Sequence, residues 1–290
     1  MGFGDRPDAR RVREEHGLQG VMPHLFPNRA DSEVYCNFKI DATKLVEWLE
    51  QDNARHPEYK TTIFHCVVAA VARMVNERPI LNRYIQGRRL YERYEISLSF
   101  VAKRHFADGA DEALLVLKPK QSDSITEISR RIYGDVTQVR QKDHATDGVD
   151  KLMDVVAKLP MPLIALICGA YKFADFWGFA PKSITDGDPN FTTVLLTNLG
   201  SIQCPAVYHH LSNLGTQSIM VAVGTLHKEE MLMEDGHKEI RDVLDIGATL
   251  DERIADGFYF ARSMKLIMYI FEHPEILEKP LSEPSGFVFR

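Results

Sequence analysis

The sequence predicts a single α/β domain, and three observations lead to this prediction. Segments with the 3.6-residue period of amphipathic helices alternate with segments of strand type. Hydrophobic residues make up 44% of the 290 residues and charged residues 26%, a balance that supports a buried core and excludes wholesale disorder. No repeat period and no Ala/Pro- or Ser/Gly-rich linker divides the chain into halves.

The strand prediction starts at Glu33, where Cys36, Phe38 and Ile40 alternate with polar residues as in a half-buried strand. Short runs rich in β-branched and aromatic residues continue the pattern, with turns expected at Gly87 and at Asp108-Gly109. The other expected strands cover residues 83–86, 90–92, 96–103, 113–117, 192–197, 217–226 and 238–249.

The helix prediction rests on apolar stripes and on capping residues. Asp41 is expected to cap a helix that runs to about Asp52, and a second helix starts at Thr61-Thr62 and ends before Pro79. The other expected helices cover residues 122–141, 147–158, much of 162–179, and 258–273, and a loop is expected at 181–189.

Charge and composition exclude several classes of protein. The net charge is −6 and the pI near 6.0, which argues against a nucleic-acid partner held by phosphate neutralisation. Four cysteines stand far apart without a C-x-x-C pair, so free thiols in a reducing compartment are expected. The polar N-terminus lacks a signal peptide core, and the longest apolar run, 161–171, is about half of the ~20 residues that span a membrane. We therefore expect a cytoplasmic protein with no membrane partner.

The expected domain organisation has three parts. Residues 1–30 are charged and proline-punctuated and are expected to form an arm or loop docked on the domain. Residues 31–275 form the domain itself, with an apolar insert at about 160–181. Residues 276–290 form a C-terminal tail.

Two groups of residues carry chemistry by type and spacing. Glu252 and Asp256 stand four residues apart, with Arg253 between them. Two interpretations fit this spacing. The segment is either a turn with acidic side chains that face solvent, or it holds two carboxylates whose pKa values are split by like charge. The adjacent His209 and His210 point in different directions, so they are not a chelating pair, and they serve either packing and solvation or a site. No residue spacing predicts a metal site, and no glycine-rich phosphate loop is present.

Four segments resemble, in order, the acyltransferase catalytic domain of 2-oxo acid dehydrogenase complexes and the related chloramphenicol acetyltransferases. The segment Leu-Asp-Glu-Arg-Ile-Ala-Asp-Gly-Phe-Tyr-Phe-Ala at 250–261 is similar to the family signature D-H-R-x-x-D-G-x-x-x-A. Residues 197–201 are similar to its S/T-N-L-G turn, 219–224 to the core strand that follows, and 63–82 to a helix ending in P-x-L-N. The resemblance covers about residues 20–275. It implies a chloramphenicol acetyltransferase-like two-layer fold in which helices pack on a mixed sheet.

The resemblance also implies a function. In the family, the signature histidine is a general base that takes a proton from a thiol or hydroxyl, and a hydroxyl near the S/T-N-L-G turn stabilises the oxyanion. The resemblance also implies a site between the subunits of a homotrimer. Coenzyme A is bound as a substrate, and no metal is involved. The small-molecule acceptor is not indicated.

Carried over by position, the resemblance assigns roles to residues of both motifs. Glu252 stands at the general-base position, and Thr197 is the first candidate for the oxyanion hydroxyl, with Ser201 second. Asp256 matches the second signature aspartate and is counted with Glu252 and Thr197 among the catalytic candidates, and the resemblance implies that it pairs with an arginine to hold the turn. The residues expected to hold the two turns are Arg253, Gly257, Asn198 and Gly200.

Three departures from the family pattern stand out. First, glutamate replaces the signature histidine, and a free Glu with pKa ~4.3 is a poor base for a thiol with pKa ~8.5. Burial could raise the pKa of the glutamate, or His209 or His210 could supply an imidazole in its place. Only about 20–30 residues precede the matching region, so no lipoyl domain of its own is expected. The insert at 160–181 is expected to pack in the core or against another subunit, or to reshape an acceptor pocket.

Three functions follow. The first is acyl transfer from an acyl-coenzyme A thioester, with Glu252 as base and Thr197 as oxyanion donor. The second is a catalytically silent trimer of the same fold that serves as scaffold or binding partner. The third is a hydrolytic variant, because a carboxylate base also suits water.

Overall fold

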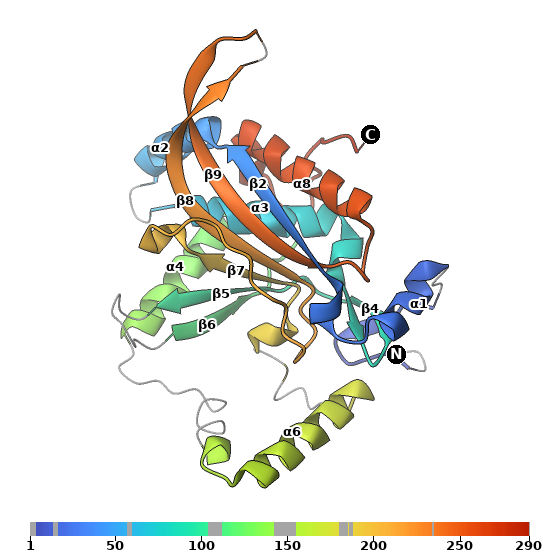
Figure 1. Ribbon diagram of the computed structural model, residues 1–290. Coiled ribbons are helices and arrows are strands. Elements are labelled where there is room, and N and C mark those ends of the chain that lie inside the picture. Colours follow the sequence, from blue (N-terminus) through green and yellow to red (C-terminus); the bar gives the residue numbers. More distant parts are fainter. Residues whose placement is uncertain are drawn as a thin grey trace.

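A six-stranded mixed sheet forms one layer of the molecule, and helices cover one of its faces (Figure 1). The computed structural model describes residues 4–13, 17–56, 60–103, 112–141, 155–179, 185, 188–233 and 235–289. In order across the sheet, the strands are β2 (Glu33–Asp41), β9 (Lys238–Asp251), β8 (Ile219–Leu232), β7 (Val194–Asn198), β5 (Leu98–Lys103) and β6 (Glu112–Leu117). The α/β prediction with a mixed sheet and packed helices is confirmed.

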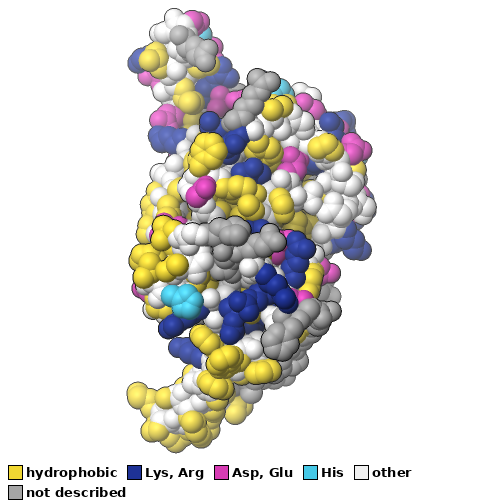
Figure 2. Space-filling model, turned by 90° about the vertical axis from the view of Figure 1, so that its right-hand side faces the viewer, with side chains coloured by type: hydrophobic (Ala, Val, Ile, Leu, Met, Phe, Trp, Pro, Cys, Tyr) yellow, Lys and Arg dark blue, Asp and Glu magenta, His cyan; other side chains and the backbone are white. Residues whose placement is uncertain are grey.

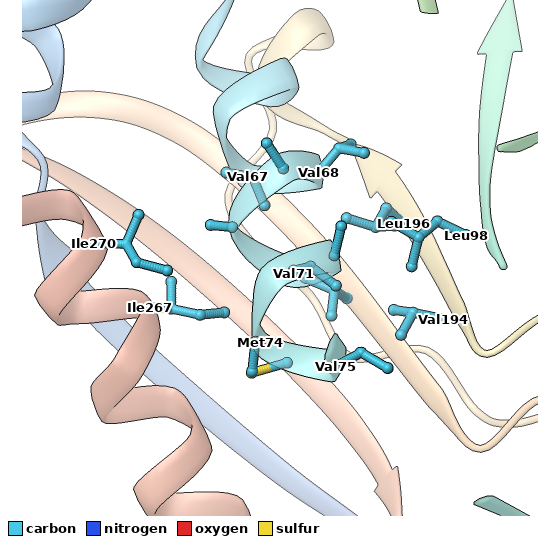
Figure 3. Close-up of a cluster of buried hydrophobic side chains, with 14 of the residues drawn as sticks. Val67, Val68, Val71, Met74, Val75, Leu98, Val194, Leu196, Ile267 and Ile270 are labelled. Carbon is cyan, nitrogen blue, oxygen red and sulfur yellow. The ribbon is translucent and has the colours of Figure 1, made fainter. Parts of the chain in front are cut away.

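The helical layer is built around α3 (Ile63–Glu77), which is buried along nearly its whole length. Its helical neighbours are α4 (Ile125–Gln141) and α8 (Gly257–Glu272), and α2 (Thr43–Arg55) packs on α8 and β9. Figure 3 shows valines of α3 lying between Leu98, Val194 and Leu196 of the sheet on one side and Ile267 and Ile270 of α8 on the other. Burial of such side chains stabilises the domain by about 1.5–3 kcal/mol each.

A second, three-stranded sheet attaches the N-terminal arm. Its strands are β1 (Ala9–Arg11), β4 (Arg89–Arg93) and β3 (Arg83–Gln86), in that order. In the described residues 4–13, β1 pairs antiparallel with β4. A short helix, α1 (Leu18–Leu25), follows.

The C-terminal residues pack on the same body. Ile276, Leu277 and Leu281 are buried, and the Ser285 hydroxyl donates to Glu77 at 2.7 Å. The segment predicted as a tail is therefore part of the domain core up to at least Ser285.

Most element boundaries agree with the prediction to within a few residues. α2 begins at Thr43 rather than at a cap on Asp41, although the Asp41 carboxylate still accepts the Thr43 N–H at 2.9 Å. β8 and β9 run further than expected, because their pairing continues through polar residues into a hairpin that projects from the body (Figure 1). The turn at 108–109, most of the helix at 147–158 and most of the loop at 181–189 lie outside the described residues.

The apolar insert folds as α6 (Met161–Phe176), which lies apart from the helical layer (Figure 1). Within the described ranges, no helix, α6 included, is long and apolar enough to cross a membrane.

Candidate functional site

A cavity of about 540 Å³ opens at the end of β7. The N-terminal turn of α3, strand β5, helix α4 and the turn after β7 supply its walls. Its lining residues include Phe64, His65, Phe100, Tyr133, Arg140, Thr197, Asn198 and Ser201. The cavity therefore combines an apolar wall with a few polar groups, the usual make-up of a small-molecule site.

Four side chains with a hydroxyl group line this cavity, Thr62, Tyr133, Thr197 and Ser201, and the two at the end of β7 differ in their hydrogen bonding. The Ser201 hydroxyl donates to the carbonyl of Asn198 at 2.8 Å, and the Ser201 N–H donates to Asn198 Oδ1 at 3.2 Å. Both bonds hold the turn. The Thr197 hydroxyl has no hydrogen-bond partner among the described residues. Of the two hydroxyls at the end of β7, that of Thr197 is therefore the one free to bind a ligand.

The turn after β7 requires a glycine. A Cβ at Gly200 would lie 2.6 Å from the carbonyl oxygen of Gly224 in β8, closer than real Cβ contacts allow. Because position 200 is glycine, the turn can approach β8 closely. This close approach fixes the positions of Thr197 and Asn198 in the cavity wall.

The cavity also holds a histidine that the sequence reasoning missed. Thr62 caps α3 by accepting the N–H of His65 at 3.3 Å, which places His65 in the first turn of the helix. Its imidazole is buried, and its Nδ1 has no partner among the described residues. Burial lowers the pKa of His65 to about 4, so the ring is neutral at pH 7. In the sequence, the Thr61-Thr62 cap before an apolar helix was the signal that could have placed His65 in the first turn of that helix.

The 250–257 turn is held by a buried ion pair. Arg253 donates to both carboxylate oxygens of Asp251, from Nε at 2.8 Å and from Nη2 at 2.6 Å. Both side chains are 1% exposed or less. Ser32 donates to the same carboxylate, and Arg253 also reaches the carbonyl of Phe26 at 2.7 Å. The acid that pairs with Arg253 is therefore Asp251, not Asp256.

Glu252 lies between the two members of this ion pair. Its N–H donates to the carbonyl of Ser32 at 3.0 Å, so its backbone is fixed against the start of β2. Its side chain is half-buried, and its carboxylate has no hydrogen-bond partner in the described part of the chain. The turn holds the position of Glu252 rigidly and leaves its carboxylate open.

Asp256 and Gly257 begin the last helix. The Asp256 carboxylate accepts the Tyr259 N–H at 2.7 Å, which makes Asp256 the N-cap of α8, and Gly257 is the first helical residue. Asp256 is exposed. Its visible contact is therefore structural, and no contact couples it to Glu252.

Within one chain, Thr197 and Glu252 lie at opposite ends of the sheet. Thr197 pairs with Ala222, and Ala222 pairs with Gly247 in β9. Glu252 follows Gly247 by five residues, roughly 16 Å along the strand at about 3.3 Å per residue, and it lies two strands across. A single chain does not bring the two groups together.

The His209-His210 segment reaches the Glu252 end of the sheet. The Leu211 N–H donates to the carboxylate of Glu33, whose backbone pairs with Asp251, and Arg29 holds the carbonyl of Ser212 at 3.2 Å. His209 is half-buried and His210 exposed, and neither lines the Thr197 cavity. In the described ranges, no cluster of His, Cys, Asp and Glu side chains could hold a metal ion.

Comparison with known proteins places this arrangement in a class. Residues 28–151 match the family model of the catalytic domain of 2-oxoacid dehydrogenases acyltransferase. The probable dihydrolipoamide acetyltransferase of Listeria monocytogenes has the same fold at 18% identity, covering 96% of this chain and 98% of that one, with a TM-score of 0.59. The dihydrolipoamide acetyltransferase of Azotobacter vinelandii, studied for the catalytic role of a serine, a histidine and an asparagine, matches at 14% identity over 92% and 94%, with a TM-score of 0.59.

A chloramphenicol acetyltransferase matches at 12% identity over 91% of this chain and 99% of that one, with a TM-score of 0.52. No curated protein sequence matches. The chain therefore has the chloramphenicol acetyltransferase-like fold. More narrowly, it has the acyltransferase catalytic-domain fold of the 2-oxoacid dehydrogenase type, and the resemblance inferred from its sequence is confirmed. The matched range ends before the 250–261 segment, so the correspondence of Glu252 rests on its motif and its place in the fold.

Proposed function

We propose that this protein transfers an acyl group from an acyl-coenzyme A thioester to a small-molecule acceptor. The observation that carries the proposal is the unpaired Thr197 hydroxyl in an open cavity of an acyltransferase fold. A polar group that the fold leaves without a partner beside a cavity is available to a bound ligand.

The proposed site is shared between copies of the chain. Because one chain holds Thr197 and Glu252 at opposite ends of its sheet, they meet only if Glu252 of one copy reaches the cavity of the next. In the proposed assembly, each copy gives its Thr197 cavity to one neighbour and its Glu252 to the other. We propose that the ring closes with three copies, as a homotrimer. The cubic core of the pyruvate dehydrogenase multienzyme complex has the same fold, which supports assembly of this fold into a symmetric oligomer.

Glu252 and Asp256 correspond in spacing to catalytic residues of a similar protein. The histidine and asparagine studied in the Azotobacter vinelandii enzyme are four positions apart, as are Glu252 and Asp256. We assign the base to Glu252, and we assign to Asp256 the support of the turn through its cap on α8.

The chemistry then has three steps. The Glu252 carboxylate takes the proton of the acceptor thiol or hydroxyl, whose sulfur or oxygen attacks the acyl carbonyl. The Thr197 hydroxyl donates to the tetrahedral oxyanion, a contact typically worth about 3–4 kcal/mol of transition-state stabilisation. The carbon–sulfur bond to coenzyme A breaks, and the coenzyme A thiolate takes the proton back.

The silent-scaffold alternative is favoured by one observation. The Glu252 carboxylate has no hydrogen-bond partner among the described residues, whereas a catalytic base is usually oriented by a neighbouring group. A partner copy would have to supply that orientation. Without it, the same trimer would bind ligands and not turn over.

The test is release of free thiol from acetyl-coenzyme A across candidate thiol, hydroxyl and amine acceptors, with water as the hydrolytic control. We expect Thr197→Val to lower kcat by about 100- to 1,000-fold with little change in KM, and Thr197→Ser to retain activity. If there is neither turnover nor calorimetric binding of coenzyme A, the acyl-transfer proposal is wrong.

Two substitutions at position 252 separate the base from the scaffold. Glu252→Gln keeps the size and removes the proton acceptor, so it should abolish transfer to a thiol. Glu252→His supplies a base with a pKa nearer to that of a thiol and should raise this activity. An unchanged rate in both variants would show that Glu252 is not the base.

A further inference from the structure

Helix α6 presents a continuous apolar stripe to solvent. Leu163, Leu166, Ile167, Phe173 and Trp177 follow the i, i+3, i+4 spacing of one helix face, with alanines at 170 and 174 between them. Leu166 and Phe173 are each 67% exposed and Trp177 49%. These five partly exposed side chains form an apolar patch on the order of several hundred Å², and a patch of this size on a monomer is often functional.

The helix is attached to the body at its C-terminal end. Arg6 donates to the carboxylate and to the carbonyl of Asp175, and Gln86 donates to the same carboxylate. Asp175 is the one acidic residue of α6, and it is buried. The remaining charge of the helix is therefore Lys172, which is exposed.

Basic side chains form a border at the C-terminal half of α6, with Arg88 and Arg89 at the end of the stripe and Lys172 on the opposite side of the helix. The turn between β3 and β4, which contacts the C-terminal end of α6, carries Arg88, and Arg89 at the start of β4 lies 5.5 Å from the Trp177 ring. Arg88 and Lys172 are exposed and line a cavity with Asp175 and Phe176. Figure 2 shows Lys and Arg side chains gathered directly above the projecting hydrophobic helix.

We propose that α6 is an interfacial helix that docks this protein on the surface of an anionic phospholipid bilayer. Exposed Leu, Phe and Trp side chains beside cations are features that α6 shares with helices of the headgroup region, and α6 is apolar around most of its circumference. The helix has 16 residues, about 24 Å at 1.5 Å per residue, so it lies along the surface and does not span. The expectation of no membrane partner rested on the inability to span and does not exclude this mode.

Charge favours a bilayer over a two-fold contact with a second copy of the chain. A two-fold contact through α6 would place the basic border of one copy near the same border of the other. Neither Arg88 nor Lys172 has an ion-pair partner within the described residues that would offset this repulsion. Anionic headgroups supply the complementary charge, and each basic residue near such a surface strengthens binding about fivefold.

The test is flotation of the intact protein with vesicles of pure phosphatidylcholine and of phosphatidylcholine with phosphatidylglycerol. We expect binding to the anionic vesicles and at least tenfold weaker binding to the neutral ones. The chain has two tryptophans, of which Trp48 is buried. A blue shift of the emission on adding anionic vesicles, lost in Trp177→Phe, would therefore place α6 in the lipid.

Matched variants separate the two parts of the proposal. We expect at least tenfold weaker vesicle binding in the double variant Leu166→Glu, Phe173→Glu, which removes apolar side chains. We expect the same loss in the double variant Arg88→Asn, Lys172→Gln, which removes basic ones. Asn is chosen at position 88 because it tolerates the positive φ there. Leu232→Glu, at an equally exposed leucine of the β8–β9 hairpin, should have no effect. This proposal stands apart from acyl transfer, because vesicle binding is measured without substrate.

Two results would overturn the proposal. One is the absence of binding to anionic vesicles by the wild-type protein. The other is a Leu166→Glu, Phe173→Glu variant that keeps its vesicle binding and changes the oligomeric state in sedimentation, which would make α6 a contact between copies. Equal binding to neutral and anionic vesicles would contradict the role of the basic border.

Discussion

The side chains around residue 252 are arranged so that structural contacts hold the turn and leave one carboxylate open. Asp251 and Arg253 neutralise one another in the interior, and Ser32 satisfies a further lone pair of Asp251. The carboxylate of Glu252, between them, has no hydrogen-bond partner among the described residues. A turn of this kind fixes the position of a functional side chain through neighbouring residues, so that the carboxylate itself stays free of structural hydrogen bonds.

Removing one member of the buried pair should be costly. Arg253→Met leaves the Asp251 carboxylate buried without its partner, and we expect a loss of about 3–5 kcal/mol in the free energy of unfolding. Urea denaturation measures this loss. Asp256→Ala, which removes an exposed helix cap, should cost about 1 kcal/mol. Similar losses in both variants would contradict the structural role of the ion pair.

His65 should make stability depend on acid pH. In the unfolded chain its pKa is near 6.5, whereas burial lowers it to about 4 in the folded protein. Between these values the unfolded state binds the proton and the folded state does not, so stability falls as the pH falls from 6.5 to 4, by roughly 3 kcal/mol in total. His65→Gln should remove this component from the difference between two urea curves at pH 7 and pH 4.5. An identical pH dependence in the variant would show that the ring is protonated freely.

At the scale of elements, the position of α6 depends on a close backbone contact with the β3–β4 turn. Gly87 has a positive φ of 57°, and a Cβ there would lie 2.2 Å from the carbonyl oxygen of Phe176. The turn can therefore approach the end of α6 only because position 87 is glycine.

Gly87→Ala should detach the C-terminal end of α6. Both the left-handed backbone and the overlap oppose an alanine, so we expect faster tryptic cleavage after Lys172 and a red shift of Trp177 emission. Gly169→Ala is the control on the same helix, because a Cβ there meets nothing within 4 Å. Equal protease resistance in both variants would show that the contact with Phe176 does not hold the helix.

Periodicity predicted the elements well where a helix or strand has one buried face. The stripe of α3 and the alternation of β2 were sufficient, since their partners lie on one side. The strand pairing of β8 with β9 beyond their hydrophobic segments was not predictable from the sequence. The residues of that hairpin are largely polar and show no alternation of buried and exposed types. The apolar run of α6 predicted a helix, but its composition matched that of a buried helix and did not reveal that its stripe faces solvent.

At the scale of the whole molecule, the two motifs recognised in the sequence lie at opposite ends of one sheet. The sequence placed Thr197 and Glu252 on their turns. It did not separate Asp251 from Asp256 as the partner of Arg253, and it missed His65, because these depend on packing between distant segments. The separation of Thr197 and Glu252 follows from strand register, which only the structure supplies.

The most direct test of the shared site is complementation between two inactive variants. Thr197→Val keeps an intact position 252, and Glu252→Gln keeps an intact cavity. Unfolding a one-to-one mixture and refolding it should restore about a quarter of the wild-type thiol-release activity, because random assembly pairs the two intact halves at that fraction of interfaces. No recovery from a mixture that reassembles into mixed oligomers would contradict the account, since the two residues would then not act together across an interface.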